Sequence, residues 1–203
     1  LSLNNGFNFN DIDDFIKRTY KFLNISDGEI EFVCEPKIDG LSISLLYENG
    51  ELSQALTRGN GYEGELVTEN ILTINNIPKK IVDFPKFIEI RGEIFISKKD
   101  FEKLNKEQLT NNKKQFSNPR NAAAGSIRQK DSKEIKNRNL KFFAYTIGQV
   151  SNENFFNSQI ELLNKFQFWG FNVPENIKLL KELDEISSYY NSMLEIRDKM
   201  NYE

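Results

Sequence analysis

Two apolar runs separated by an Asn-Gly pair constrain the fold of this chain more than any other feature. Residues 41–47 (LSISLLY) and 52–57 (LSQALT) have the composition of β-strands, and Asn49-Gly50 stands between them. Asn-Gly flanked by two such runs is the strongest short-range signal of a tight hairpin. The two runs are therefore predicted to pair antiparallel.

Periodicity predicts a mixed fold around this hairpin. Side chains alternate between apolar and charged over residues 88–96, which indicates a further strand with a polar face. Other strands are predicted at 30–33 and 140–147, and helices at 11–23 (capped by Asn10 or Asp11), 97–109 (with Ser97 and Asp100 as a capping box), 119–129, 155–169 and 181–200. Hairpin strands mixed with helices indicate an α+β fold, in which mainly antiparallel sheets are flanked by helices.

The absence of histidine restricts the chemistry. The 203 residues contain no His and a single Cys, Cys34. This excludes Ser-His-Asp and Cys-His catalysis, His-ligated metals and intrachain disulfides. One cysteine suits a reducing compartment, and no secretory signal or run of about 18 apolar residues is visible, so a cytoplasmic protein without a membrane span is expected.

A lysine lies between two carboxylates in residues 35–40 (EPKIDG). In an extended chain Glu35, Lys37 and Asp39 project to one face, since strand side chains alternate. A solvated row of ion pairs explains this spacing, and so does a nucleophilic amine. A lysine has an ordinary pKa of about 10.4 and needs activation to attack near neutral pH. Flanking carboxylates oppose that activation, so the nucleophile hypothesis requires additional positive charge.

A glycine-rich loop at residues 59–64 (GNGYEG) matches the G-x-G-x-x-G pattern of dinucleotide-binding folds, with Asp83 about 20 residues later. Its context does not fit, because the preceding strand is the second arm of a hairpin rather than the first strand of a β-α-β unit. Glu63 and Glu65 would also repel a pyrophosphate. A flexible turn and a ligand-contacting loop led by Arg58 both stay open.

Charged residues gather in two further segments. Residues 89–93 (EIRGE) place three charges on one strand face, as a solvated strand or a binding site would. The chain has 27 basic and 30 acidic residues, so it does not bind nucleic acid by overall charge. Its one basic concentration surrounds residues 118–129 (NPRNAAAGSIRQ), where Arg120 and Arg128 have the geometry to hold phosphates, and a merely solvated helix is the alternative. The neighbouring basic residues are Lys113, Lys114, Lys130, Lys133, Lys136 and Arg138.

Together, these segments resemble the adenylation (nucleotidyltransferase) domain of bacterial NAD-dependent DNA ligases. Residues 37–40 (KIDG) resemble the family's K-x-D-G motif, and residues 58–61 (RGNG) resemble its R-G-[DN]-G loop. Residues 89–96 (EIRGEIFI) are similar to its next motif, 118–129 to a segment of the NAD-dependent branch, and 1–5 (LSLNN) to the start of the domain. The resemblance covers residues 1–203 and implies a covalent nucleotidyltransferase (ATP-grasp-like) fold.

The resemblance also implies roles for individual residues. Lys37 would attack the adenylyl phosphorus of NAD, release nicotinamide mononucleotide and carry AMP as a phosphoramidate. Glu35 would contact the adenine, Arg58 and Glu93 would hold the ribose and phosphate, and Ser2 and Leu3 would border the pocket. Arg120 and Arg128 would grip nicked duplex DNA. AMP would then pass to the 5′-phosphate of the nick, and the 3′-hydroxyl would displace it.

A divalent ion, Mg²⁺ or Mn²⁺, is expected as a cofactor, with unknown protein ligands. The family continues beyond this segment into lysine-containing motifs, which would supply the positive charge that Lys37 needs. The N-terminal helical, oligonucleotide-binding, zinc, helix-hairpin-helix and BRCT domains are also outside residues 1–203. We therefore expect a domain truncated at its C-terminal end, which acts as a monomer and is poorly active or inactive alone.

Two alternative functions stay open. The first is an ATP-dependent covalent nucleotidyltransferase of the RNA ligase or capping type, against which residues 118–129 argue. The second is a non-catalytic DNA-binding module built around Arg120 and Arg128. Labelling of the protein by NAD compared with ATP distinguishes the first alternative from an NAD-dependent ligase. Replacement of Lys37 distinguishes the second, because a non-catalytic DNA-binding module would leave nick joining intact.

Overall fold

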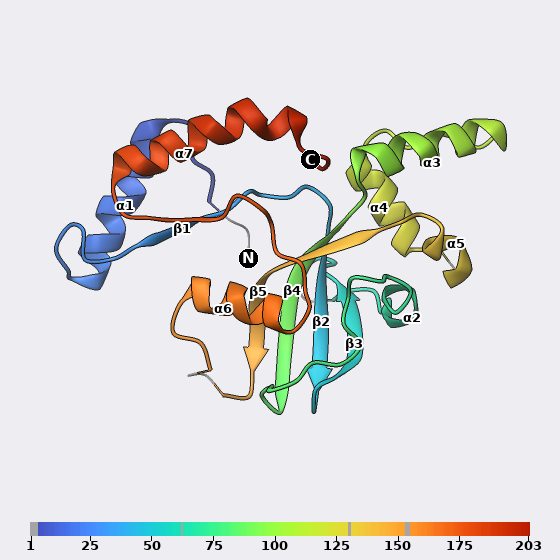
Figure 1. Cartoon of the computed structure of the whole chain (residues 1–203), viewed down its shortest axis with the longest axis horizontal. Coiled ribbons are helices and arrows are strands. Elements are labelled where there is room, and N and C mark those ends of the chain that lie inside the picture. Colours follow the sequence, from blue (N-terminus) through green and yellow to red (C-terminus); the bar gives the residue numbers. More distant parts are fainter. Residues whose placement is uncertain (1–3, 62, 130, 153–154) are drawn as a thin grey trace. The chain divides into compact units, whose positions relative to one another are not determined.

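A computed structural model describes every residue of the chain except 1–3, 62, 130 and 153–154 (Figure 1). The chain forms two compact units. The first consists of Leu1–Pro36 and Glu175–Lys199, and the second of Lys37–Pro174 and Met200–Glu203. Lys37 is thus the first residue of the second unit. No helix in the described part of the chain is both long and apolar enough to cross a membrane.

The first unit pairs two helices with a small sheet. Helix α1 (Phe9–Leu23) and helix α7 (Leu183–Ile196) bury Ile16, Tyr20 and Ile186 together, and a 3-10 turn, η1 (Arg197–Lys199), follows α7. Strand β1 (Phe32–Cys34) pairs antiparallel with β6 (Lys178–Leu180). The prediction of Asn10 or Asp11 as the first helix cap was wrong. Asn8 caps α1, because its side chain accepts a hydrogen bond from the Asp11 amide (3.1 Å).

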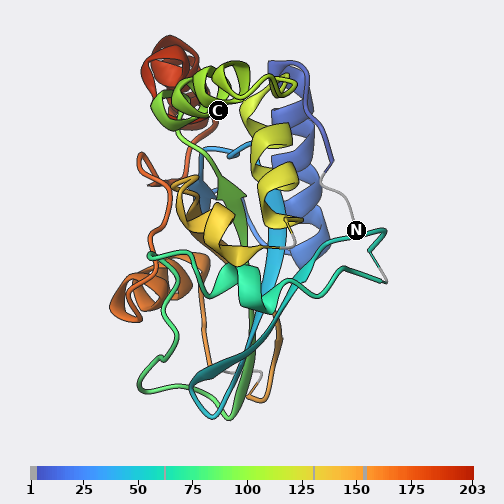
Figure 2. The ribbon, with the colours of Figure 1, turned by 90° about the vertical axis from the view of Figure 1, so that its right-hand side faces the viewer.

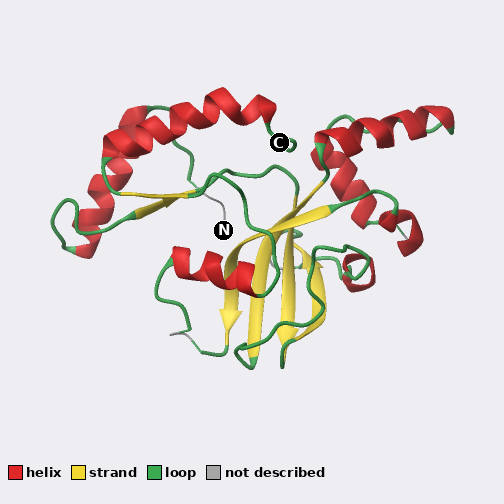
Figure 3. Cartoon of the chain, viewed as in Figure 1, coloured by secondary structure: helices red, strands yellow, loops and turns green. Residues whose placement is uncertain are grey.

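The second unit is built on an antiparallel four-stranded sheet, drawn in yellow in Figure 3. Its strands are β2 (Leu41–Glu48), β3 (Glu51–Thr57), β4 (Phe87–Phe95) and β5 (Lys141–Val150), in the order β3-β2-β4-β5. The predicted hairpin is confirmed, since β2 pairs with β3 around Asn49 and Gly50, which have φ of 51° and 81°. The predicted strand at 88–96 is β4, and the α+β class with antiparallel sheets is confirmed.

One face of this sheet is apolar and covered. Ile43, Leu45, Ile90 and Phe142 are fully buried on it. Helix α6 (Gln159–Phe168) contacts β5, beside which it lies in Figure 1, and helps to cover this face. The short helix α2 (Thr68–Ile71) contacts β3 and also helps to cover it. The alternate residues of β2 and β4 therefore face the opposite side, where they form a polar surface.

Three more helices accompany the sheet. Helix α3 (Lys98–Thr110) begins after Ser97, whose hydroxyl accepts from the Asp100 amide as predicted (3.1 Å), and α5 spans Ser132–Lys136. Helix α4 (Pro119–Ile127) buries Ala122 and Ala123, which let it approach β2 and β4 closely. Figure 2 shows α3 crossing one end of α4, which runs alongside the sheet. Elements α2, α5 and β6 were not predicted.

Candidate active site

On the polar face of the sheet, several polar side chains hydrogen-bond to one another and form a layer that we call the bonded floor. The Glu89 carboxylate accepts from the Arg91 guanidinium (2.7 and 3.2 Å) and from the Ser44 hydroxyl (2.7 Å). Further along the same face, the hydroxyls of Ser42 and Tyr145 lie 2.9 Å apart. Within residues 89–93, Glu89 and Arg91 therefore neutralise each other on the strand.

The loop that carries Lys37 is held at each residue after the lysine. Ile38 is buried against Phe95 and Phe143. The Asp39 carboxylate accepts from the Arg120 guanidinium at the start of α4 (2.6 Å). A Cβ on Gly40 would lie 2.2 Å from the Ile94 carbonyl oxygen, so only glycine fits at this approach to β4. Lys37 itself is exposed. The loop is thus fixed on the body of the second unit while its amine faces solvent.

Glu93 is the buried carboxyl group beside this loop. Its side chain is 8% exposed, and burial raises its pKa to about 7. The positive charges of Lys37 and Arg120 and a hydrogen bond from the Gly40 amide limit the rise, while the negative charge of Asp39 adds to it. These effects place Lys37, Asp39 and Arg120 close enough to Glu93 to interact electrostatically. The structure therefore brings three predicted site residues, Lys37, Glu93 and Arg120, into one cluster together with Asp39.

Glu93→Gln is expected to change the pH dependence of stability. The folded chain holds the Glu93 proton up to about pH 7, whereas the ordinary carboxyl pKa is 4.5. The stability contribution of this protonated group is therefore complete below pH 4.5 and is lost as the pH rises through 7. The shift in pKa corresponds to a loss of about 3 kcal/mol in the free energy of unfolding as the pH rises. A glutamine does not titrate, so the variant should not show this loss.

Urea unfolding of both proteins across this pH range measures the effect. The difference in the free energy of unfolding should move in favour of the variant as the pH rises. Parallel pH profiles for the two proteins would contradict the burial of a titrating carboxyl group at this position.

Arg58 and Tyr145 lie at the same end of the polar face. The Arg58 amide donates to the Ser42 carbonyl (3.2 Å). Burial raises the pKa of Tyr145; the negative charge of Glu93 adds to this rise, and the positive charges of Arg91 and Arg58 oppose it. Tyr145 was not predicted as a site residue. The only signal for it in the sequence is a tyrosine within an otherwise apolar strand, which is too common to be diagnostic.

The glycine-rich loop after β3 is not a dinucleotide-binding turn. Gly59 and Gly61 have φ of 52° and 96°, and the chain then returns to its own strand instead of opening a helix. Leu56 and Leu66 form a β-bridge, and the Thr57 amide donates to the Glu65 carbonyl (3.0 Å). The loop therefore closes on the hairpin with Arg58 at its start, in agreement with the sequence-based rejection of a Rossmann fold.

The two predicted DNA-contacting arginines are both half-exposed and ion-paired. Arg120 contacts Asp39, and Arg128 donates to Glu65 (2.7 Å) from the end of α4. Asn70 fixes that end, because its side-chain amide donates to the carbonyls of Ile127 (2.6 Å) and Gln129 (3.0 Å). Both arginines thus point away from the core on a firmly anchored helix.

The basic residues around α4 do not form one uniform surface. Arg138 is used internally, since its guanidinium donates to the buried Ser126 hydroxyl (2.9 Å) and lies over the Phe116 ring. Burial lowers the pKa of Arg138. Lys113 and Lys114 are exposed, while Lys130 and the side chain of Lys133 lie outside the described residues.

Three of the residues predicted to bind the nucleotide are not placed in this cluster. Ser2 and Leu3 lie outside the described residues. Glu35 is half-buried and belongs to the first compact unit, so its contact with an adenine stays a prediction.

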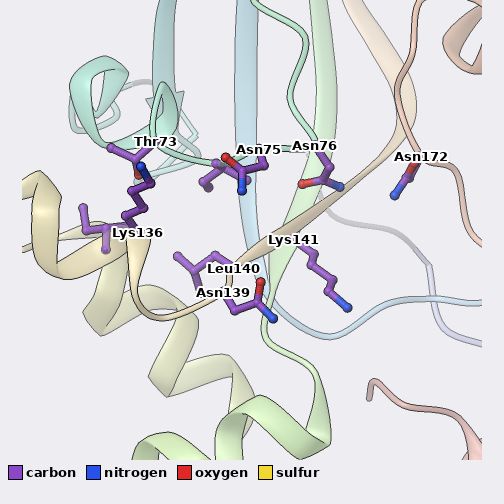
Figure 4. A pocket seen from close by; sticks show the side chains of 10 residues that line it. Thr73, Asn75, Asn76, Lys136, Asn139, Leu140, Lys141 and Asn172 are labelled. Atoms are coloured by element: carbon purple, nitrogen blue, oxygen red, sulfur yellow. The ribbon is translucent and has the colours of Figure 1, made fainter.

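A separate hollow of about 220 Å³ lies between the segment after α2 and the turn before β5 (Figure 4). Asn75, Asn76, Asn139 and Lys141 are among its lining residues, and none of the predicted site residues that the structure describes lines it. The Asn76 side chain is already bonded to the backbone of Phe142 in both directions (2.8 and 3.1 Å). This hollow therefore belongs to the scaffold rather than to the Lys37 cluster.

Comparison with known proteins identifies relatives over the whole chain. Residues 1–203 match the family described as the NAD-dependent DNA ligase adenylation domain. The chain is 48% identical to a DNA ligase of Rickettsia massiliae over 203 residues and 46% identical to a DNA ligase of Bartonella henselae over 205 residues. These matches cover 100% of this chain but only 29% and 28% of the two relatives. The chain thus spans less than a third of the length of these ligases.

Proposed function

The chain belongs to the family of NAD-dependent DNA ligase adenylation domains, and on this premise we propose that Lys37 accepts the adenylyl group of NAD. The neutral amine nitrogen forms a bond to the adenylyl phosphorus as the phosphorus–oxygen bond to nicotinamide mononucleotide breaks. Once this bond has formed, the nitrogen carries a positive charge and releases one proton to solvent, which leaves a neutral phosphoramidate. The mononucleotide leaves with the electron pair of the broken bond. The exposed lysine on an otherwise fixed loop beside a polar sheet face carries this proposal.

The nucleotide would lie over the end of the polar face where Lys37, Arg58 and Glu93 converge. Arg58 has the charge to bind a phosphate, and Glu93 has a carboxyl group suited to a ribose hydroxyl. Glu35 is proposed to contact the adenine, and Ser2 and Leu3 to border the pocket. The four-stranded sheet is, on this proposal, the core of a covalent nucleotidyltransferase (ATP-grasp-like) fold.

A divalent cation fits this arrangement only as a partner of the nucleotide. Among the described residues, no group of three or more carboxylate or cysteine side chains is placed to hold a metal ion. Mg²⁺ commonly uses one or two carboxylates together with substrate phosphates and water. Asp39 is the partly exposed carboxylate beside Lys37 that would join such a set, and the ion would offset charge at the phosphates.

Adenylate transfer is tested directly with NAD that carries a label in its adenylyl phosphate. The polypeptide that contains this domain is incubated with labelled NAD and Mg²⁺, and digested peptides are examined for one AMP residue on Lys37. Labelling by NAD but not by ATP supports the proposal. Labelling by ATP alone indicates the ATP-dependent class of nucleotidyltransferase, and labelling by neither overturns the proposed reaction.

Nicked duplex DNA is the proposed second substrate, held by Arg120 and Arg128. Arg120 in the first turn of α4 and Arg128 at its C-cap lie about two helical turns apart, and both are half-exposed. A phosphate would replace a carboxylate partner at either side chain, since a guanidinium binds both groups in the same geometry. Half-exposed ion pairs are weak, so this exchange is accessible.

Arg128→Ala should separate the two steps of the reaction. Arg128 is paired with Glu65, away from Lys37, so the variant should form lysyl adenylate at the normal rate but join nicks at least about tenfold more slowly. Nick joining is measured from pre-adenylated protein as a function of salt. Arg120→Ala is the informative contrast, because it also releases Asp39 and should slow both steps. Equal joining rates for Arg128→Ala and wild type would contradict the DNA-contact proposal.

A further inference from the structure

The last four residues of the chain return to the second unit and bond to its catalytic loop. Although α7 and η1 belong to the first unit, Met200–Glu203 belong to the second. The Lys98 amide donates to the Asn201 carbonyl (2.9 Å), and the Asp39 amide donates to the Glu203 carbonyl (2.7 Å). The second of these bonds holds a residue only two positions from Lys37.

Tyr202 anchors this returning segment. Its ring packs edge-on against Phe95 (5.6 Å between centroids) and Phe143 (5.5 Å), and these two rings stack on each other (4.7 Å). Ile38 is buried in the same cluster. The ring of Tyr202 therefore packs on the aromatic cluster that buries Ile38, and the carbonyl of Glu203 bonds to the next residue of the loop, Asp39.

Among the described residues, the other contacts of the loop do not hold the backbone of Asp39, which this segment does. Arg120 holds only the Asp39 side chain, through a half-exposed ion pair of the kind that exchanges readily. Gly40 fixes the far end of the loop against β4. The backbone of Asp39 is held by the Glu203 carbonyl, and that carbonyl is kept in place by the half-buried ring of the preceding residue, Tyr202.

We infer that Tyr202 is a positioning residue for Lys37. Through the aromatic cluster and the Glu203–Asp39 hydrogen bond, it keeps the lysine amine in line with the adenylyl phosphorus. This inference rests on the proposed function, because it concerns the rate of that same transfer. A displacement of about 1 Å at a reacting atom is enough to slow a reaction by about a hundredfold. Weakening the anchor should therefore slow the transfer step more than it weakens NAD binding.

The test compares Tyr202→Ala with Tyr202→Phe in the polypeptide that contains this domain. Tyr202→Phe keeps the ring and should retain the wild-type rate. Tyr202→Ala should lower the single-turnover rate of lysyl adenylate formation by about ten- to a hundredfold, with a much smaller change in the NAD concentration at half-maximal rate. Tyr190→Ala is a matched control, since Tyr190 is 53% exposed on α7 and should have no effect.

Hydrogen exchange at the Asp39 amide supplies an independent readout. Exchange should accelerate in Tyr202→Ala but not in Tyr202→Phe, because only the alanine variant loses the support of the Glu203 carbonyl. If the alanine variant does not fold, Tyr202→Leu retains apolar volume without the ring and takes its place. A wild-type transfer rate in the folded variant, or unchanged exchange at Asp39, overturns the inference. Failure of the wild-type protein to accept adenylate overturns the proposed function instead, and the exchange experiment still decides whether Tyr202 holds the loop.

Discussion

Lys37→Ala is expected to abolish transfer of adenylate to the protein and, with it, nick joining by the polypeptide that contains the domain. In the proposed mechanism the Lys37 amine forms the covalent bond to AMP, and alanine has no side-chain nitrogen that could replace it. The label from NAD should fall below detection, by at least about a thousandfold. Because the Lys37 side chain is exposed, the midpoint of thermal unfolding should barely change.

A second measurement makes this prediction specific to the covalent step. Nicked DNA that already carries the adenylate on its 5′-phosphate bypasses Lys37, and the alanine variant should still seal it. Lys37→Arg is the matched charge-preserving variant, and it should be equally unable to accept adenylate. Normal adenylation of either variant would assign the nucleophile elsewhere and remove the basis of the proposed function.

Gly40→Ala should be the most damaging conservative change in the loop that carries Lys37. The new methyl group would lie 2.2 Å from the Ile94 carbonyl oxygen and 3.0 Å from the Glu93 side chain. The carbonyl belongs to the sheet backbone, so the loop must move instead of β4. We expect a loss of stability of about 1–3 kcal/mol, as for other overpacked sites. Because Lys37 moves with the loop, adenylation should also slow by about a hundredfold.

Gly6→Ala provides the control for this prediction. A methyl group at Gly6 would make an ordinary contact of 3.5 Å with the Asp11 side chain, so little change in stability or rate is expected. Urea unfolding and single-turnover labelling measure the two effects separately. Wild-type behaviour of Gly40→Ala would contradict the close approach of the loop to β4.

The sequence correctly predicted those turns and helix ends that depend only on a few neighbouring residues. The Asn49-Gly50 hairpin and the Ser97 cap form as expected, since turn geometry and capping depend on a few neighbouring residues. The N-terminus of α1 was misplaced because Asn8, Asn10 and Asp11 are all suitable caps by composition. Only the capping box between Asn8 and Asp11 distinguishes them, and it is visible in the structure.

The contacts that complete the candidate site could not be predicted in this way. Arg120 meets Asp39 from 81 positions away, and Tyr145 meets Ser42 from 103 positions away. Tyr145 also depends on an irregularity in the pairing of β4 with β5, which no local pattern encodes. Short elements such as β6, with three residues, are defined by their partner strand rather than by propensity.

The bonded floor of the sheet has a consequence for selectivity. The Glu89 carboxylate is saturated by Arg91, Ser44 and the Gln149 amide, and a Cβ on Gly148 would lie 2.0 Å from it. Such a surface has little remaining capacity to discriminate between ligands by charge. On the proposed function, residues around the edge of the polar face should therefore determine which nucleotide binds. Substitutions at that edge should change ligand preference without breaking the hydrogen bonds of Glu89.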